Sequence, residues 1–64
     1  MYQIYYPANI NHPYDRRCYK NLWQAVHDAE EMREICYTPM QIIDTDTEKI
    51  VWEHWLWSEP RYIK

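Results

Sequence analysis

Residues 21–36, NLWQAVHDAEEMREIC, decide the fold, because their apolar side chains recur at steps of three and four positions. This period places an apolar stripe along one side of an α-helix. Asn21 suits the N-cap position and Gln24 follows it at the spacing of a capping box. Pro39 limits the other end, since the residue before a proline disfavours the α conformation. The stripe consists of Leu22, Ala25, Val26, Ala29, Met32 and Ile35, with Cys36 beside it.

Strands are predicted on both sides of this helix. Residues 2–6 are dense in β-forming side chains and stop at Pro7, so they predict a first strand. Residues 40–44 and 49–57 predict a second and a third strand, joined by the polar residues 45–48. This connection lacks glycine, so we expect a type I turn in which Asp or Thr side chains bond back to the backbone.

Two segments carry no regular pattern. Residues 58–64 contain Pro60 and are expected to leave the sheet. Residues 7–20 predict a long loop, and loops of this length in compact domains are either functional or disordered. The turn formers in that loop are Pro7, Asn9, Asn11, Pro13 and Asp15.

The element order is therefore βαββ, and the predicted fold is a single small α+β domain over residues 1–64. A three-stranded sheet carries the helix on one face. A right-handed crossover would make the first two strands parallel. We expect the third strand to lie between them, because its long apolar run suits a central position.

One helix covers only one face of such a sheet, so the opposite face, called here the open face, meets water or a partner. The chain has seven Tyr and four Trp but no Phe. The Tyr hydroxyl and the Trp indole N–H need hydrogen-bond partners, so these rings favour the boundary between a protein and water or a partner. The alternative is that they only fill a small core. The alternative for the open face is that residues 7–20 and 58–64 fold back over it. Because Glu53 is the least tolerable core residue, the side chains expected to face the helix are Ile4, Ile42, Ile50, Trp52 and Leu56. Those expected near the open face are Tyr5, Val51, Trp55 and Trp57.

Catalytic, cofactor and metal sites are not predicted. The potential ligands and nucleophiles are His12, His27, His54, Cys18 and Cys36, and their spacing matches no common metal motif. His27 shares a helix face with Glu31, a pair that is usually an ordinary surface contact. The chain has no glycine for a phosphate loop and little room for a pocket with a supporting shell. We therefore expect a protein that is not an enzyme.

Cysteine usage and the absence of targeting signals indicate a cytoplasmic protein. If Cys18 and Cys36 flank the helix, their Cα atoms lie on the order of 25 Å apart, against the ~5.5 Å of a disulfide. Residues 1–6 lack the basic start and apolar stretch of a signal peptide, and no run approaches the ~18 apolar residues of a membrane span.

Residues 14–20 interleave aromatic and basic side chains, as proteins that bind single-stranded nucleic acid do. The formal net charge of −3 argues against that role, because nucleic-acid-binding domains are usually basic. The alternative is that these basic side chains pair with Asp28 and Glu31 of the helix.

Residues 38–53, TPMQIIDTDTEKIVWE, follow the helix and resemble the C-terminal half of small βαββ accessory proteins encoded by tailed bacteriophages. The resemblance implies a protein that occludes or redirects a host enzyme, or that blocks a defence system. Residues 7–20 and the Trp-rich residues 52–57 have no counterpart in that family.

These observations predict a binding protein of the inhibitor or adaptor kind, whose open face, 7–20 loop and acidic helix face contact a host protein with a basic surface. The alternatives are a homodimer that pairs the open face with its copy, and a nucleic-acid binder that uses Arg16, Arg17 and Lys20. The acidic helix face comprises Gln24, His27, Asp28, Glu30, Glu31 and Glu34. The predicted partner-binding residues are Tyr5, Tyr14, Arg16, Arg17, Tyr19, Val51, Trp55 and Trp57.

Overall fold

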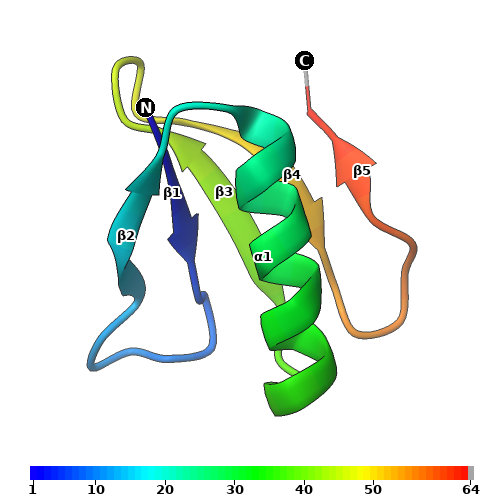
Figure 1. Cartoon of the computed structure of the whole chain (residues 1–64). Coiled ribbons are helices and arrows are strands. Elements are labelled where there is room, and N and C mark those ends of the chain that lie inside the picture. Colours follow the sequence, from blue (N-terminus) through cyan, green and yellow to red (C-terminus); the bar gives the residue numbers. More distant parts are fainter. Residues whose placement is uncertain (64) are drawn as a thin grey trace.

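The computed structural model describes residues 1–63 and shows one helix packed against a five-stranded antiparallel sheet (Figure 1). The predicted α+β class is confirmed, and the prediction of only three strands is wrong. The strands lie in the order β2-β1-β3-β4-β5. In chain order the elements are β1 (Tyr2–Tyr5), β2 (Tyr14–Tyr19), α1 (Leu22–Cys36), β3 (Met40–Asp44), β4 (Lys49–His54) and β5 (Arg61–Tyr62).

The strand directions and order also differ from the prediction. β1 and β3 are antiparallel, with Tyr2 opposite Asp44 and Ile4 opposite Ile42. The unpredicted strand β2 is the reason, because it returns the chain to the start of β1 before the helix begins. The helix then crosses the sheet, and β3 runs back beside β1. β3 is therefore the central strand, and the prediction that the third predicted strand lies in the middle is wrong.

β2 forms within the segment 7–20 that was predicted to be a loop. Its polar sequence is held in the sheet by contacts from Gln3 of β1 and from Tyr6, the residue that follows β1. The side-chain amide of Gln3 donates to the carbonyl of Asp15 at 2.7 Å, and the hydroxyl of Tyr6 donates to the Asp15 carboxylate at 2.8 Å. Only residues 7–13 remain as a connection, closed by a bond from the Tyr6 N–H to the Pro13 carbonyl at 2.6 Å.

The described residues after Pro60 stay in the sheet instead of leaving it, and Lys64 lies outside the described residues. β4 ends at His54, earlier than predicted, and the chain returns as β5, with Arg61 opposite Glu53 and Tyr62 opposite Trp52. The N–H of Ile63 then donates to the carbonyl of Val51 at 2.9 Å. Parts of both segments, residues 14–19 and 61–62, thus widen the sheet at its two edges, where the alternative had the segments fold back over the open face.

The hydrophobic core lies between the helix and the sheet. Ile4, Ile42 and Trp52 face the helix as predicted, and Trp52 is only 1% exposed. Ile50 does not, because β4 carries an extra residue between the partners of Ile42 and Ile43, and Ile50 remains 37% exposed. Leu56 lies beyond the end of β4 and is half-buried. The fully buried hydrophobic residues are Ile4, Ala25, Ala29, Met40, Ile42 and Trp52.

The helix begins and ends close to the predicted residues but by different contacts. Asn21 occupies the N-cap in an extended conformation without a side-chain bond, so the predicted capping box is wrong. At the other end Tyr37 adopts the left-handed conformation, and its N–H donates to the carbonyl of Arg33 at 2.7 Å. Ile35 is exposed, so the apolar stripe is buried only up to the last turn.

Candidate functional site

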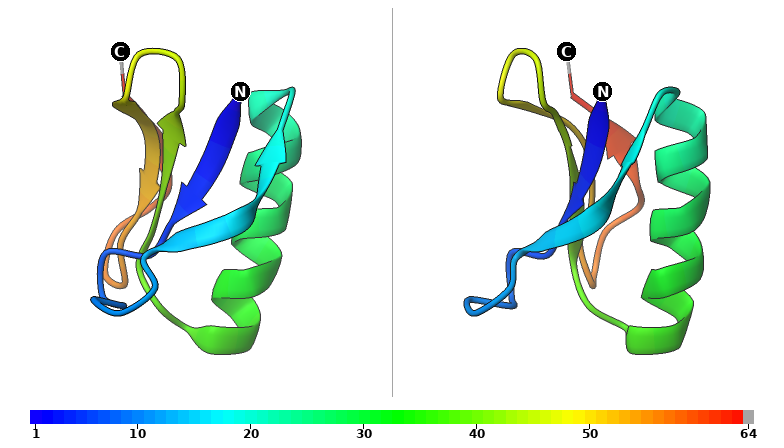
Figure 2. Two further views of the ribbon diagram at one scale, coloured as in Figure 1. Left: turned by 90° about the vertical axis from the view of Figure 1, so that its left-hand side faces the viewer. Right: turned by 60° about the vertical axis from the view of Figure 1, so that its left-hand side comes forward.

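The open face of the sheet is the side away from the helix. Figure 2 shows α1 on one side of the sheet, and no second layer of residues 1–63 covers the other. Successive side chains of a strand alternate between faces, so the neighbours of Ile4, Ile42 and Trp52 point to the open side. The strand register places one row of such neighbours across all five strands. From β2 to β5 this row is Tyr14, Tyr5, Gln41, Glu53 and Arg61.

Next to Gln41, the central residue of this row, lies a buried carboxylate. Glu53 is 9% exposed, and the guanidinium Nε of Arg61 donates to it at 2.9 Å. Burial acts to raise the pKa of Glu53, but hydrogen bonding from Trp55, Arg61 and Gln41, together with the charge of Arg61, outweighs it and lowers that pKa below the usual value. The open face therefore has a polar, ionised centre, and its aromatic rings lie around that centre.

On the β2 side of the centre lies an aromatic pair. The rings of Tyr5 and Tyr14 pack at a centroid distance of 5.0 Å, and Tyr14 is exposed. Beside this pair is a shallow hollow of about 470 Å³, lined by Gln3, Tyr14, Ile43, Thr45 and Glu48. Tyr5 thus lies on the open face as predicted, and Tyr14, predicted within the 7–20 loop, lies beside it.

On the other side lies the loop between β4 and β5, which presents two tryptophans. Trp55 is 39% exposed and lies beside Glu53, whereas Trp57 is 92% exposed. The Arg33 guanidinium of the helix donates to the carbonyls of Trp55 at 3.1 Å and Leu56 at 3.4 Å, and the Tyr37 hydroxyl donates to Leu56 at 3.4 Å. The loop backbone is therefore held against the end of the helix, with the Trp57 side chain exposed to solvent and the Trp55 side chain partly exposed beside Glu53.

Val51 does not belong to this surface. It was predicted near the open face, but it is half-buried and packs against the core cluster. The reason is the extra residue in β4, which breaks the simple alternation of sides at this position. Trp57 also lies outside the sheet itself, because β4 ends at His54.

The three basic side chains of residues 14–20, Arg16, Arg17 and Lys20, are all exposed. Arg17 contacts Asp15 at 3.3 Å and Asp28 of the helix at 3.8 Å. The predicted pairing with the helix is therefore confirmed for Asp28.

Tyr19 joins β2 to the helix. It is half-buried and packs against the core cluster. Burial, followed by the neighbouring Asp28 carboxylate, raises the pKa of Tyr19 to about 12. Tyr19 therefore supports the contact between sheet and helix as well as lining the surface beside it.

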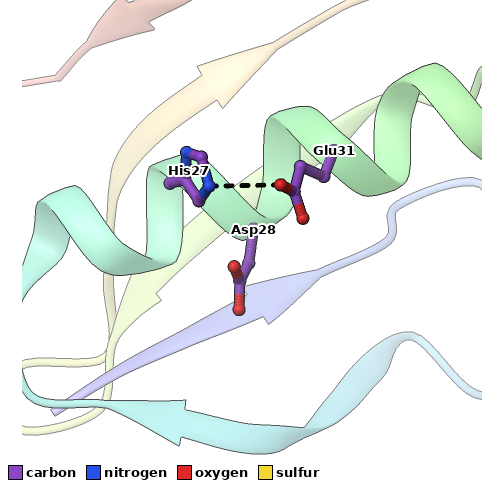
Figure 3. A group of neighbouring side chains, drawn as sticks. All are labelled: His27, Asp28 and Glu31. Atoms are coloured by element: carbon purple, nitrogen blue, oxygen red, sulfur yellow. Dashed lines mark ion pairs between the residues drawn. The ribbon is translucent and has the colours of Figure 1, made fainter.

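Helix α1 carries a cluster of three potential metal ligands, His27, Asp28 and Glu31, shown in Figure 3. Their ligand atoms lie within 4.8 Å of one another. His27 pairs with Glu31 at 3.2 Å, so Glu31 is not the partner of the basic segment. Asp28 points away from that pair, toward the strands, where it meets Arg17. Each member thus already has a protein partner.

The other polar groups of interest are separate from this cluster. The buried His54 ring contacts the Glu30 carboxylate, which ties the end of β4 to the helix. Cys18 and Cys36 are both exposed and free. Cys36 and His12 line a further hollow of about 290 Å³, together with Tyr6 and Met32.

No family model, curated protein or solved structure matches the chain. Within residues 1–63, no helix has the length and apolar character needed to cross a membrane.

Sequence reasoning missed two parts of these surfaces. The Glu53–Arg61 pair could not be found, because nothing in the sequence indicated that β5 would return beside β4. Trp23 could have been noticed, because it lies outside the apolar stripe of the helix, and it is 67% exposed. A large ring on the polar side of a helix is a signal for an exposed contact surface.

Proposed function

We propose that this chain is a non-enzymatic protein-binding module. The observation that carries the proposal is the pair Trp55 and Trp57, exposed on a loop whose backbone is fixed by Arg33 and Tyr37. Tryptophan, tyrosine and arginine dominate the energetics of protein interfaces, and a loop whose backbone is already fixed loses less entropy on binding.

The size of the molecule is compatible with this role. Its accessible surface is 4760 Å², and a standard interface takes about 800 Å² from each partner. Such an interface would occupy about a sixth of the surface, enough to include the β4–β5 loop and the row across the open face. The ionised Glu53 in that row favours a partner that brings polar or basic groups.

The narrower role that we propose is an inhibitor or modulator of a host enzyme or defence system, acting in the host cytoplasm. Support for it comes from the resemblance of residues 38–53 to phage accessory proteins. The acidic helix face supports a partner with a basic surface.

The test begins with the immobilised protein and a lysate of the cell in which it is made, followed by mass spectrometry of the captured proteins. The affinity of the purified partner is then measured for the wild type, Trp55→Ala and Arg17→Ala. Trp55→Ala is expected to weaken binding by about 2 kcal/mol or more, and Arg17→Ala by less than about 1 kcal/mol. Equal losses would refute the assignment of the interface to the Trp55 side.

Two further measurements separate the alternatives. Light scattering that gives twice the monomer mass would favour a homodimer through the open face. Titration with oligonucleotides at two salt concentrations tests a nucleic-acid role of Arg16, Arg17 and Lys20, and a steep salt dependence would favour it. The binding-module proposal expects a monomer with no such binding.

A further inference from the structure

The net charge of the chain is concentrated on one element. Helix α1 contains four acidic residues, Asp28, Glu30, Glu31 and Glu34, and one basic residue, Arg33, which gives −3. The whole chain also carries a formal net charge of −3, so all other residues together are neutral. A partner that meets the solvent face of the helix therefore meets an acidic surface, whichever partner it is.

A hollow lies where this helix meets β2. It has a volume of about 340 Å³ and is lined by Tyr19, Trp23, Gln24, His27 and Asp28. The hollow thus combines an exposed indole ring with a carboxylate that points toward the strands (Figure 3). Aromatic faces and carboxylates are the two groups that bind organic cations best.

The chain already shows the chemistry of this site. Arg17 brings its guanidinium to 3.8 Å from the Asp28 carboxylate, so this carboxylate attracts a guanidinium from β2. At that separation the contact with Arg17 is an ion pair without a hydrogen bond, and a carboxylate can accept further N–H donors beside its existing partners, Arg17 and Tyr19. His27, which also lines the hollow, pairs with Glu31 at 3.2 Å.

We propose that this hollow receives a basic side chain of the protein partner, with arginine as the best fit. The Trp23 ring would lie against the guanidinium and the Asp28 carboxylate would accept its N–H groups. The proposal rests on the proposed function and adds the chemistry that the partner must present. A bare metal ion bound by the carboxylates would not need the Trp23 ring, whereas a planar guanidinium can stack on it.

The test uses a small probe in place of the unidentified partner. Nα-acetyl-arginine methylamide is titrated into ¹⁵N-labelled protein, and the matched uncharged probe is the citrulline compound. The arginine probe should shift the resonances of the Trp23 indole N–H and the Gln24 and Asp28 amides, with millimolar affinity, while citrulline should not. Trp23→Ala and Asp28→Asn should each weaken binding about twofold to fivefold.

The control variant is Glu34→Gln, because Glu34 lies exposed on the same helix and its replacement changes the charge equally, away from the hollow. It should weaken binding of the arginine probe by less than about twofold. Equal shifts with citrulline, shifts elsewhere on the molecule, or an equal loss in Glu34→Gln and Asp28→Asn would each overturn the proposal. A titration with Zn²⁺ alone that displaces the probe at micromolar concentration would assign the cluster to a metal and overturn it as well.

The probe separates this proposal from the proposed function. If the arginine probe binds at the hollow while Trp55→Ala leaves partner binding unchanged, the assignment to the Trp55 side fails and the hollow remains. If Trp55→Ala weakens partner binding while the probe fails to bind, the binding module remains and the hollow is refuted. Circular dichroism of Trp23→Ala checks that the variant is folded, as expected for a largely exposed ring.

Discussion

Trp52 and Trp57 are close in the sequence, yet they should respond in opposite ways to replacement by alanine. Trp52 is 1% exposed in the core, whereas Trp57 is 92% exposed on the β4–β5 loop. A buried tryptophan removes about 200 Å² from water, which at ~25 cal/mol per Å² corresponds to about 5 kcal/mol. Losses of ~3–5 kcal/mol are typical of Trp→Ala in cores.

This loss is large relative to the expected stability of the domain. At ~0.05–0.15 kcal/mol per residue, a chain of 64 residues has a free energy of unfolding of about 3–10 kcal/mol. Trp52→Ala should therefore remove about a third of the stability or more. Trp57→Ala should change it by less than ~0.5 kcal/mol, because the ring contributes little burial.

The assay is urea unfolding followed by far-ultraviolet circular dichroism, in which the midpoint should fall for Trp52→Ala at an unchanged slope. If Trp52→Ala does not fold, Trp52→Leu gives a measurable midpoint, since it retains part of the buried area. Acrylamide quenching provides a second reading, because Trp52 should be the protected indole. A loss below about 1 kcal/mol in Trp52→Ala, or equal losses in Trp52→Ala and Trp57→Ala, would refute the burial argument.

Three further predictions concern ionisation and thiols. Because the pKa of Glu53 is lowered in the folded protein, its ionisation stabilises the fold at pH values above the unfolded-state pKa of ~4.3. This contribution is lost as the pH falls through the folded-state pKa. Glu53→Gln should therefore flatten the acid side of a plot of the free energy of unfolding against pH. Because the pKa of Tyr19 is raised to about 12, this residue stabilises the fold below the unfolded-state pKa of ~10, and the stability is lost as the pH rises through 12. Tyr19→Phe should therefore flatten the alkaline side of the same plot. It should also remove one late step from the tyrosinate absorbance titration. Cys18 and Cys36 are exposed, so Ellman's reagent should titrate two thiols in the folded protein, and protection of either would contradict the structure.

The sequence predicted the elements whose signals are local. The helical period of residues 21–36 lies within one segment, and α1 covers Leu22–Cys36. β3 has the predicted bounds, 40–44. The predicted turn at 45–48 also forms, with the Asp44 carboxylate accepting the Asp46 N–H at 2.9 Å. In each case the residues that determine the structure are neighbours in the chain.

The strands at the two edges depend on distant contacts and carried no local signal. β2 is polar, and it becomes a strand because Gln3 and Tyr6 bind Asp15. β5 is only two residues long, and Arg61 is held beside β4 by Glu53. Missing β2 was sufficient to reverse the predicted direction of β3 relative to β1.

Backbone details account for the remaining errors. The extra residue in β4 turns Val51 toward the core and leaves Ile50 partly exposed, although both followed the alternation rule in the prediction. The chain contains no glycine, and within the described residues the positive φ angles, 45° and 60°, are adopted by Tyr37 and Glu48. For the candidate site, the sequence predicted that Tyr5 and Trp55 lie near the open face, and they do. The Glu53–Arg61 pair depends on the register between β4 and β5, which composition does not reveal.

The pairing of β1 with β3 has a consequence for how the molecule assembles. Every other strand pair joins neighbours along the chain, so the chain has two local units, β1–β2 and β3–β4–β5. Contacts within each unit close short loops, whereas the pairing of β1 with β3 must close a loop that contains β2 and the helix. Neither unit can close a core alone, because Ile4 belongs to one and Ile42 and Trp52 belong to the other. The β1–β3 pairing therefore couples the two units into one cooperative unfolding transition. Neither unit should persist as a folded fragment.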